Sequence, residues 1–371
     1  MIELSNLVEK WDFKRESNKE LKLSDINFYK NIYDNILSLA KFKFEQYQPL
    51  PHPDEKDFLS RLLEWLEQFK EDKQKFLFFL ASKIIFFTRD QIDYLMKNVF
   101  ERRIKREILK EIINDNSRGI NNYDFKKAIG YFQVELDKTL FCGLSDSARI
   151  NDFVHINREI NRRKSTGFDL PTLLYPSKIK DKLSGTSLKD LCKKFEAIIL
   201  EKDDVIADKS RLVVLEDTCC SGSDFINFLN NIRDIDLPFK SIYLAPYIIS
   251  YMGKKNIENW INKNKRLNYN VTLVYGSYIT KELKCFDEDQ SYLKIDWKDN
   301  KDICEEIKKI STEIYNQNFS ENLKKEDRFG VNGLKNVFVT YYNCPDTSLP
   351  IIWFPNEGNW KPIFLRSSRI I

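Results

Sequence analysis

The residues best suited to chemistry in this sequence are two adjacent carboxylates, Glu216 and Asp217, followed by a loop of small residues, 218–223. Four apolar residues, 212–215, precede the carboxylates and predict a buried strand, and a helical pattern follows from Asp224. At such a turn the first N–H groups of the helix and its dipole favour an anion. The loop therefore predicts a phosphate site. The carboxylates before it would accept hydrogen bonds from the hydroxyls of a sugar attached to that phosphate.

Five loop residues are predicted to surround the phosphate. The hydroxyls of Ser221 and Ser223 add side-chain donors, and Gly222 permits a close backbone approach. Because a carboxylate in the first helical turn would repel a phosphate, we expect Asp224 to point outward. An ordinary strand-to-helix connection capped by Ser223 is the alternative. The candidate phosphate-binding residues are Cys220, Ser221, Gly222, Ser223 and Asp224.

The cysteine pair Cys219–Cys220 at the start of the loop permits a second interpretation, a thiol nucleophile. A thiolate at a helix N-terminus is more acidic than usual. The sequence has only two histidines, His52 and His155, and neither is near the loop. We interpret the cysteines as small packing residues and keep a cysteine hydrolase as an alternative.

A second small polar loop, residues 143–149, follows a shorter apolar run, 139–142. Hydroxyls and backbone N–H groups suit the oxygens of a diphosphate, and a guanidinium suits its charge. Taken alone, such a segment is more often a surface turn. The candidate residues are Ser145, Asp146, Ser147 and Arg149.

Short apolar runs alternate with helical patterns after about residue 130, which predicts an α/β fold with a central, mostly parallel sheet. Ligands of such sheets bind beyond the carboxyl ends of the strands. Earlier in the chain the apolar spacing is helical, and Thr88–Gln91 form a capping-box sequence. We predict an all-helical N-terminal region, residues 1–128, and an α/β domain, residues 129–371. The predicted strands are 139–142, 212–216, 241–245, 271–275 and 337–341, and the predicted helices among them are 187–200, 224–232 and 255–262.

Composition excludes several classes of protein. A net charge of +4 among 116 charged side chains argues for neither a nucleic-acid nor a membrane partner. The seven cysteines have no metal-binding spacing, and their odd number without a secretory signal predicts a reduced, cytoplasmic protein. The longest apolar stretch, 76–87, is too short to span a bilayer and predicts a buried helix. We expect no membrane association.

The segment 212–225 resembles the ribose-phosphate motif of type I phosphoribosyltransferases. The resemblance implies that Glu216 and Asp217 bind the ribose and that 220–224 bind the 5′-phosphate of phosphoribosyl pyrophosphate. It implies that the loop ending at Arg149 holds the pyrophosphate, with Mg²⁺ carried by that pyrophosphate and no protein residue assigned as a metal ligand. The basic segment 151–180 looks like the family's flexible loop, or is a solvated helix end. Cys219, Cys220 and Asp224 depart from the family pattern.

The C-terminal segment 343–353 is similar to the tail of phosphoribosyltransferase-like proteins of bacterial conflict (antiviral) systems. Together the two resemblances cover about residues 135–366. They imply an effector or regulator in antiviral defence, with the helical N-terminal region as the contact for a partner protein. Whether the domain is an active transferase or a non-catalytic sensor of a nucleotide or ribose phosphate stays open. Trp353 or Tyr342 could stack on a base, although core packing is the commoner use. The basic cluster 102–106 is interpreted as an exposed helix face, and a nucleic-acid partner is left open.

Overall fold

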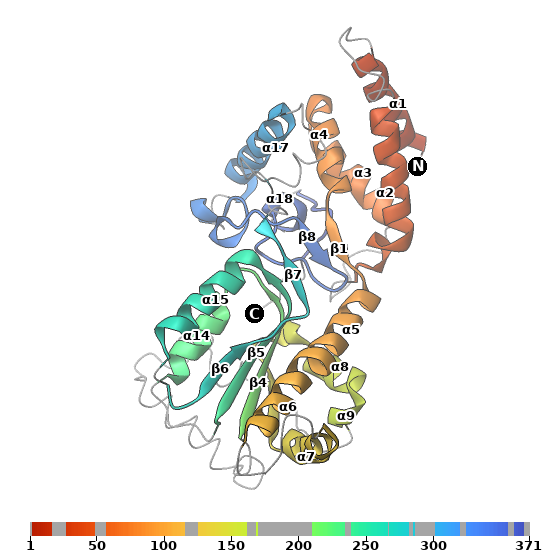
Figure 1. Ribbon diagram of the computed structural model, residues 1–371. Coiled ribbons are helices and arrows are strands. Elements are labelled where there is room, and N and C mark those ends of the chain that lie inside the picture. Colours follow the sequence, from red (N-terminus) through yellow and green to blue (C-terminus); the bar gives the residue numbers. More distant parts are fainter. Residues whose placement is uncertain are drawn as a thin grey trace. The chain divides into compact units, whose positions relative to one another are not determined.

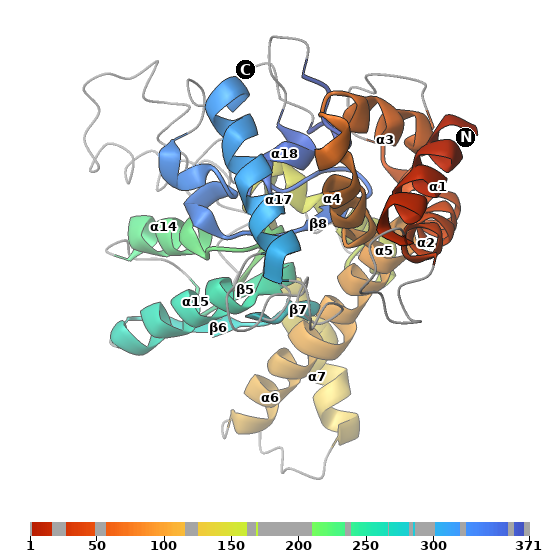
Figure 2. The same cartoon turned by 90° about the horizontal axis from the view of Figure 1, so that it is seen from above.

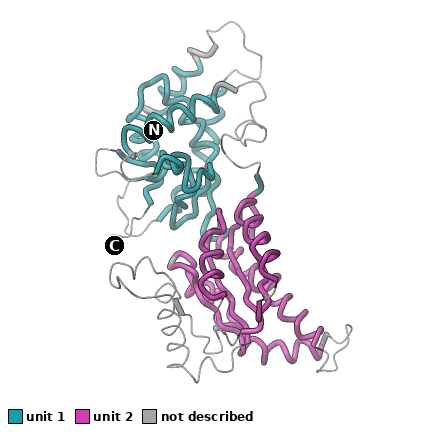
Figure 3. Tube along the Cα trace, turned by 90° about the vertical axis from the view of Figure 1, so that its left-hand side faces the viewer, with its two compact units in different colours: residues 1–91, 280–371 teal, residues 92–279 magenta. Residues whose placement is uncertain are grey.

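The computed structural model of the 371-residue chain is shown in Figure 1. It describes residues 2–16, 27–48, 57–115, 125–161, 168–169, 210–233, 239–265, 267–281, 285, 301–319, 324–354 and 360–366. These residues form two compact units, coloured separately in Figure 3. Unit 1 comprises residues 1–91 and 280–371, and unit 2 comprises residues 92–279.

Unit 2 is built on a six-stranded sheet in which all pairings between the described strands are parallel. The strand order is β3-β2-β4-β5-β6, and β7 continues the edge by pairing with β5 beyond β6. This arrangement confirms the predicted α/β fold with a parallel sheet. The strands are β2 Thr139–Gly143, β3 Phe168–Asp169, β4 Arg211–Cys219, β5 Ser241–Ser250, β6 Asn270–Leu273 and β7 Ser277–Ile279.

Helices cover both faces of this sheet (Figures 1 and 2). On one face the apolar residues of β2, β4 and β5 form a core with Phe225, Phe228 and Ile257 from α14 and α15. On the other face the rings of Phe100, Phe141, Phe153 and Tyr247 are in contact. The helices of unit 2 are α14 Ser223–Ile232, α15 Tyr251–Lys263, α5 Arg89–Asn98 from residue 92, the π-helix η3 Val99–Ile104, α6 Lys105–Asn114, α7 Phe125–Asp137, the 3₁₀ turn η5 Asp146–Ala148, α8 Ile150–Ile156 and α9 Arg158–Asn161.

The predicted domain boundary after residue 128 differs from the boundaries of the two units, which lie after residues 91 and 279. The segment from residue 92 to 128 belongs to the unit that contains the sheet. Its apolar face packs against strands, as Phe100 does against Phe141 of β2. Helical periodicity shows that a face is buried but not which partner buries it, so the sequence pattern could not assign this segment.

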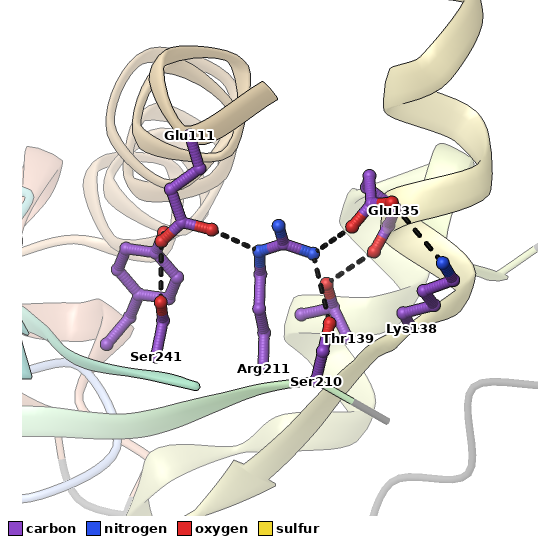
Figure 4. A network of polar contacts seen from close by, with 8 residues as sticks. Glu111, Glu135, Lys138, Thr139, Ser210, Arg211 and Ser241 are labelled. Atoms are coloured by element: carbon purple, nitrogen blue, oxygen red, sulfur yellow. Dashed lines mark hydrogen bonds and ion pairs between the residues drawn. The ribbon is translucent and has the colours of Figure 1, made fainter. Parts of the chain in front are cut away.

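A buried ion-pair network ties α6 and α7 to the amino end of the sheet (Figure 4). Arg211, at the start of β4, donates to Glu111 Oε2 of α6 at 2.6 Å and to Glu135 Oε2 of α7 at 2.5 Å. The other oxygen of Glu111 accepts from the hydroxyls of Ser241 and Tyr243 on β5 at 2.7 and 2.5 Å. The network therefore fixes two helices to the two central strands, at the end opposite the predicted ligand site.

Unit 1 is mainly helical and holds a second, two-stranded sheet in which β1 pairs in parallel with β8. Two predictions are wrong here. Residues 85–87 form a strand rather than the end of a buried helix, and the predicted strand 337–341 pairs with them rather than joining the main sheet. Short Phe- and Ile-rich runs are ambiguous between helix and strand, and strand pairing is a long-range choice. The elements are α1 Ile2–Glu16, α2 Phe28–Phe42, η2 Phe44–Gln46, α3 Phe58–Glu67, α4 Glu71–Ser82, β1 Ile85–Phe87, α17 Lys301–Ile314, η7 Tyr315–Phe319, η8 Lys325–Asp327, η9 Val331–Gly333, β8 Phe338–Thr340 and α18 Pro350–Trp353.

Two local expectations in unit 1 can be compared with the structure. The capping box is confirmed, because Thr88 N donates to Gln91 Oε1 at 2.9 Å and Gln91 N donates to Thr88 Oγ1 at 3.3 Å. Trp353 is a core residue, 5% exposed, whose Nε1 donates to the Ser348 carbonyl at 2.8 Å. The ring of Trp353 is therefore packed in the core, which is the commoner use of such aromatic residues.

Candidate functional site

The two loops predicted from sequence meet at the carboxyl ends of β2 and β4. Ser145 Oγ and Ser147 Oγ of the second loop donate to Glu216 Oε1 at 2.8 and 3.1 Å. The parallel register brings them there, since Gly143 at the end of β2 lies opposite Leu215, one residue before Glu216. Both carboxylates are buried, each 5% exposed. The predicted acidic pair and the predicted diphosphate loop thus form one site.

The two carboxyl groups have different electrostatic surroundings. Burial, and then the charge of Asp217, raise the pKa of Glu216 well above its ordinary value. Burial also raises the pKa of Asp217, but hydrogen bonds from Glu216, Thr218 and Ser147 counteract it. Thr218 N donates to Asp217 Oδ1 at 2.6 Å. Glu216 is therefore the member that keeps a proton, and Asp217 carries the negative charge of the pair.

Glu216→Gln is expected to stabilise the protein at neutral pH by about 0.5–2 kcal/mol, typical of single stabilising substitutions. A carboxyl whose pKa is raised on folding contributes stability that is fully present below its unfolded pKa and is lost as pH rises through the raised pKa. Glutamine keeps the oxygen that accepts from Ser145 and Ser147 and never ionises. Thermal unfolding of both proteins across pH should show the gain at pH 7–8 and its disappearance toward the ordinary pKa of 4.5. A gain that did not depend on pH would contradict the burial of an ionisable Glu216.

The predicted phosphate loop connects β4 to α14 without side-chain capping. β4 ends at Cys219, Gly222 is the N-cap residue with φ 80°, and α14 begins at Ser223 with no side-chain cap hydrogen bond. Ser221 Oγ lies 2.6 Å from Ser223 Oγ and accepts from Ser223 N at 3.2 Å. Ser223 is therefore not the cap that the alternative interpretation required. Asp224 is exposed, as expected for a side chain that points away from an anion.

The start of α15 packs against the phosphate loop and donates hydrogen bonds to its carbonyl groups. This contact was not predicted from the sequence. Ser250 Oγ donates to the Cys220 carbonyl at 2.5 Å, and Asn256 Nδ2 donates to the Ser221 carbonyl at 2.9 Å. Ser250 also caps α15 by accepting from Gly253 N at 3.2 Å. A Cβ on Gly253 would lie 2.5 Å from the Cys219 carbonyl oxygen. The sequence held a signal for this support: Ser250 ends an apolar strand and lies three residues before Gly253.

Gly253→Ala and Gly130→Ala form a matched pair with opposite expected effects. The added methyl at Gly253 would press on the Cys219 backbone, and overpacking of this kind costs about 1–3 kcal/mol. At Gly130, inside α7, no atom lies within 4 Å of the new methyl, so the higher helix propensity of alanine should add about 0.5–1 kcal/mol. Urea unfolding measures both. Equal effects would mean that α15 does not abut the loop.

Tyr247 of β5 is a second residue that sequence reasoning missed. Its hydroxyl donates to the Ala148 carbonyl of the second loop at 2.7 Å, and its ring stacks on Phe153 at 6.0 Å. Burial raises its pKa well above the ordinary value, and the nearby charges of Glu216 and Asp217 raise it further. Tyr247 is thus a neutral anchor that holds the second loop beside the acidic pair. Nothing in the local sequence pattern distinguishes it from an ordinary strand tyrosine.

Arg149 lies at the end of the second loop in a left-handed conformation, with φ 48°. Its Nε donates to Asp152 Oδ2 of α8 at 2.5 Å. The predicted diphosphate contact therefore requires this guanidinium to turn away from Asp152. The side chain of Asp146 lies outside the described part of the chain. In the basic segment predicted to be the flexible loop, Arg162, Arg163 and Lys164 lie outside the described residues, as do Gly167, Pro171 and the predicted helix 187–200.

The cysteine interpretation finds no support in the geometry of the loop. Cys219 and Cys220 are 5% and 6% exposed. Burial raises the pKa of the Cys219 thiol well above its ordinary value, and neighbouring acidic groups raise it further. A nucleophilic cysteine needs the opposite shift. Packing is the role that these surroundings favour.

The oxygen atoms at the site suit a metal cation that is bound mainly by the phosphates of a ligand. Among the residues that the structure describes, no group of three or more His, Cys, Asp and Glu side chains could hold a metal ion. The charged Asp217 is a hard oxygen donor, and Mg²⁺ commonly combines one or two such groups with water and substrate phosphates. The residues present therefore fit Mg²⁺ bound mainly through phosphates. In the same part of the chain, no helix has the length and apolar character needed to cross a membrane.

The carboxylate pair, the glycine-containing phosphate loop and the parallel sheet agree with a comparison against known families. A family model described as PRTase-CE matches residues 62–366, well over half of the chain. The chain belongs to the PRTase-CE family. It is thus a phosphoribosyltransferase-like protein, as the sequence motif predicted. No curated protein and no solved structure matches it.

The match extends the expected resemblance toward the N-terminus. The sequence motifs placed its start near residue 135, whereas the PRTase-CE match begins at residue 62. It therefore includes the second half of α3 and the elements from α4 to α7, which the motif-based resemblance had left outside. Those helices carry no ligand-binding motif, so no local pattern could assign them to the family.

Proposed function

We propose that this PRTase-CE protein binds phosphoribosyl pyrophosphate, or a related ribose phosphate, at residues 216–224. The observation that carries the proposal is the meeting of two loops: Ser145 and Ser147 lie within hydrogen-bonding distance of Glu216, beside a loop that leads into a helix. In this arrangement Asp217 and Glu216 accept the ribose hydroxyls. The N–H groups that begin α14 and the hydroxyls of Ser221 and Ser223 face the 5′-phosphate.

Transfer would break the bond between the ribose C1 and pyrophosphate, which leaves positive charge on the sugar. The acceptor's lone pair would then form the new bond to C1, and its proton would leave to water. The negative charge of Asp217 stabilises that charge, because a buried carboxylate interacts more strongly than one in water. Ser145, Ser147 and a reoriented Arg149 bind the leaving pyrophosphate. Mg²⁺, when bound to the pyrophosphate, neutralises part of its charge. No histidine base is needed in this scheme.

The direct test is release of pyrophosphate from phosphoribosyl pyrophosphate in the presence of Mg²⁺. A coupled phosphate assay, with panels of nucleobases and amines as acceptors, should show turnover above the rate without protein. The absence of release with every acceptor, together with tight binding, would favour the second candidate below. The absence of both would reject the ribose-phosphate site itself.

A non-catalytic sensor of a ribose phosphate or nucleotide is the second candidate. Two contacts favour it: Glu216 Oε1 already accepts from both serines, and Arg149 is paired with Asp152. A ligand bound at the site would have to replace these contacts. Ligand binding would therefore change the position of the second loop. Calorimetry should then show Mg²⁺-dependent binding without product.

A role in bacterial antiviral defence is part of the proposal and rests on the resemblance of the C-terminal segment 343–353. In that role the protein acts in the cytoplasm, and its helical N-terminal region contacts a partner protein. The six described cysteines are buried and form no disulfide, which agrees with a reducing compartment. The genes that neighbour this one give the simplest test. We expect a neighbouring gene for a reverse transcriptase, a nuclease or a signalling enzyme. Neighbouring genes for housekeeping nucleotide metabolism would contradict the role.

A further inference from the structure

Two tyrosines and two cations from three separate segments of unit 2 form one cluster, the tyrosine–cation cluster. It consists of Arg103 of η3, Lys254 of α15, Tyr275 after β6 and Tyr278 of β7. Lys254 Nζ lies 5.4 Å from the centre of the Tyr275 ring and 5.3 Å from that of Tyr278. Arg103 lies over Tyr275 at 5.8 Å, and the two ring centres are 6.2 Å apart. These are cation–π distances.

The cluster lies on the edge of the sheet at the same level as the phosphate loop. Cys219 of β4 is opposite Ile249 of β5, and Ile249 is opposite Tyr278 of β7. Two strand spacings separate Cys219 from Tyr278, about 10 Å. Gly276, which precedes β7, lets the helical segment of Leu95 and Val99 approach this edge closely. A Cβ at Gly276 would lie 3.2 Å from Val99 and 3.3 Å from Leu95. The helical segment that carries Arg103 is thus held against the edge (Figure 1).

The surface around the cluster is positively charged and open. Arg102, Arg103 and Arg106 are exposed, whereas Lys105 of the same stretch is paired with Glu101 and Glu159 and adds no free charge to this surface. Tyr278 is 36% exposed, and the Lys254 side chain is 30% exposed. Glu258, 3.8 Å from Lys254, offsets part of this charge. η3 is a π-helix, a feature often found where a helix is adapted to a function.

We propose that the tyrosine–cation cluster binds single-stranded nucleic acid. Bases stack on the ring of Tyr278, and the backbone phosphates contact Arg103 and the exposed Arg102 and Arg106. An exposed aromatic ring beside exposed cations is what binding of a strand without a fixed sequence requires, and Tyr278 supplies that ring while Tyr275 is part-buried. A membrane-binding surface would call for an apolar face, and an acidic peptide would not use the tyrosine ring. The proposal does not depend on binding of a ribose phosphate at 216–224.

The test is fluorescence anisotropy of the full chain with fluorescein-labelled oligomers of about twelve nucleotides, one arm with DNA and one with RNA, at about 50 mM salt. Tyr278→Ala should weaken binding about tenfold, because base stacking is lost. Tyr278→Phe keeps the ring and should bind within about twofold of the unchanged protein. Arg103→Gln should lower the slope of log affinity against log salt by about 0.7, equivalent to one phosphate contact.

Tyr131→Ala is the matched control, since Tyr131 is a 42% exposed tyrosine on α7 in the same unit. It should bind like the unchanged protein. A thermal melt of each variant checks folding, and Arg103→Gln keeps the test decisive should Tyr278→Ala unfold. Absence of binding to both oligomers at low salt would overturn the proposal. So would equal losses for Tyr278→Ala and Tyr131→Ala, or full competition by inorganic polyphosphate, which has charge but no bases.

Discussion

Asp217→Asn is expected to abolish release of pyrophosphate from phosphoribosyl pyrophosphate, with a loss of about 10²–10³-fold or more in turnover. Asparagine has the size of aspartate and can accept a hydrogen bond from Thr218 N as Asp217 does. The substitution removes the negative charge that would face the sugar as pyrophosphate leaves. Because Asp217 is 5% exposed, water cannot replace that charge. Initial rates of pyrophosphate release at saturating Mg²⁺ measure the effect.

Asp217 rather than Glu216 should show the larger loss. The pKa of Glu216 is raised well above its ordinary value, so this carboxyl is the one that keeps a proton beside Asp217. Glu216→Gln therefore changes the charge less than Asp217→Asn does. Asp137→Asn, at the exposed end of α7, is the control and should retain full turnover. Unchanged turnover in Asp217→Asn would remove the acidic pair from the mechanism.

Arg211→Ala is expected to destabilise the protein by about 3–5 kcal/mol, the cost of breaking a buried ion pair. The Arg211 and Glu135 side chains are 8% and 4% exposed, and the pair holds a 2.5 Å hydrogen bond. Alanine leaves the Glu135 carboxylate buried without its guanidinium and releases Glu111 from β4 (Figure 4). The hydrogen bonds to Glu135 and Glu111 raise the pKa of Arg211, against the effect of burial. Urea unfolding monitored by tryptophan fluorescence measures the loss.

Lys138→Ala supplies the comparison for Arg211, since Lys138 contacts the same Glu135 at 3.5 Å with a side chain 43% exposed. An exposed contact of this kind contributes less than about 1 kcal/mol. Arg211→Met combined with Glu135→Leu should recover most of the stability lost in Arg211→Ala, because both buried charges are then removed. Equal losses for Lys138→Ala and Arg211→Ala would show that burial does not set the strength of this network.

The ligand-binding end of the fold could be predicted because its signals are local. An apolar strand, two carboxylates and a small loop are contiguous at 212–224, and the parallel-sheet rule places the end of β2 beside the end of β4. Ser145 and Ser147 were predicted from the small polar loop that follows the apolar run 139–142, and the structure brings both to Glu216.

The parts that could not be predicted depend on contacts between distant segments. Tyr247 and Gly253 act through backbone carbonyls at Ala148 and Cys219, which no local pattern reveals. The pairing of β1 with β8 joins residues more than 250 positions apart. The exposed face of 97–106 had the pattern of an ordinary solvated helix. Its contact with the sheet edge, where Arg103 lies over Tyr275, joins segments far apart in the sequence.

The most direct test of the ribose-phosphate site is a crystal structure of the protein with phosphoribosyl pyrophosphate and Mg²⁺. We predict that the 5′-phosphate lies against the N–H groups of residues 221–224 and that the ribose hydroxyls donate to Asp217 and Glu216. We also predict that the pyrophosphate contacts Ser145 and Ser147 after these serines leave Glu216. Density for the ligand elsewhere, with the serines still bound to Glu216, would contradict the account.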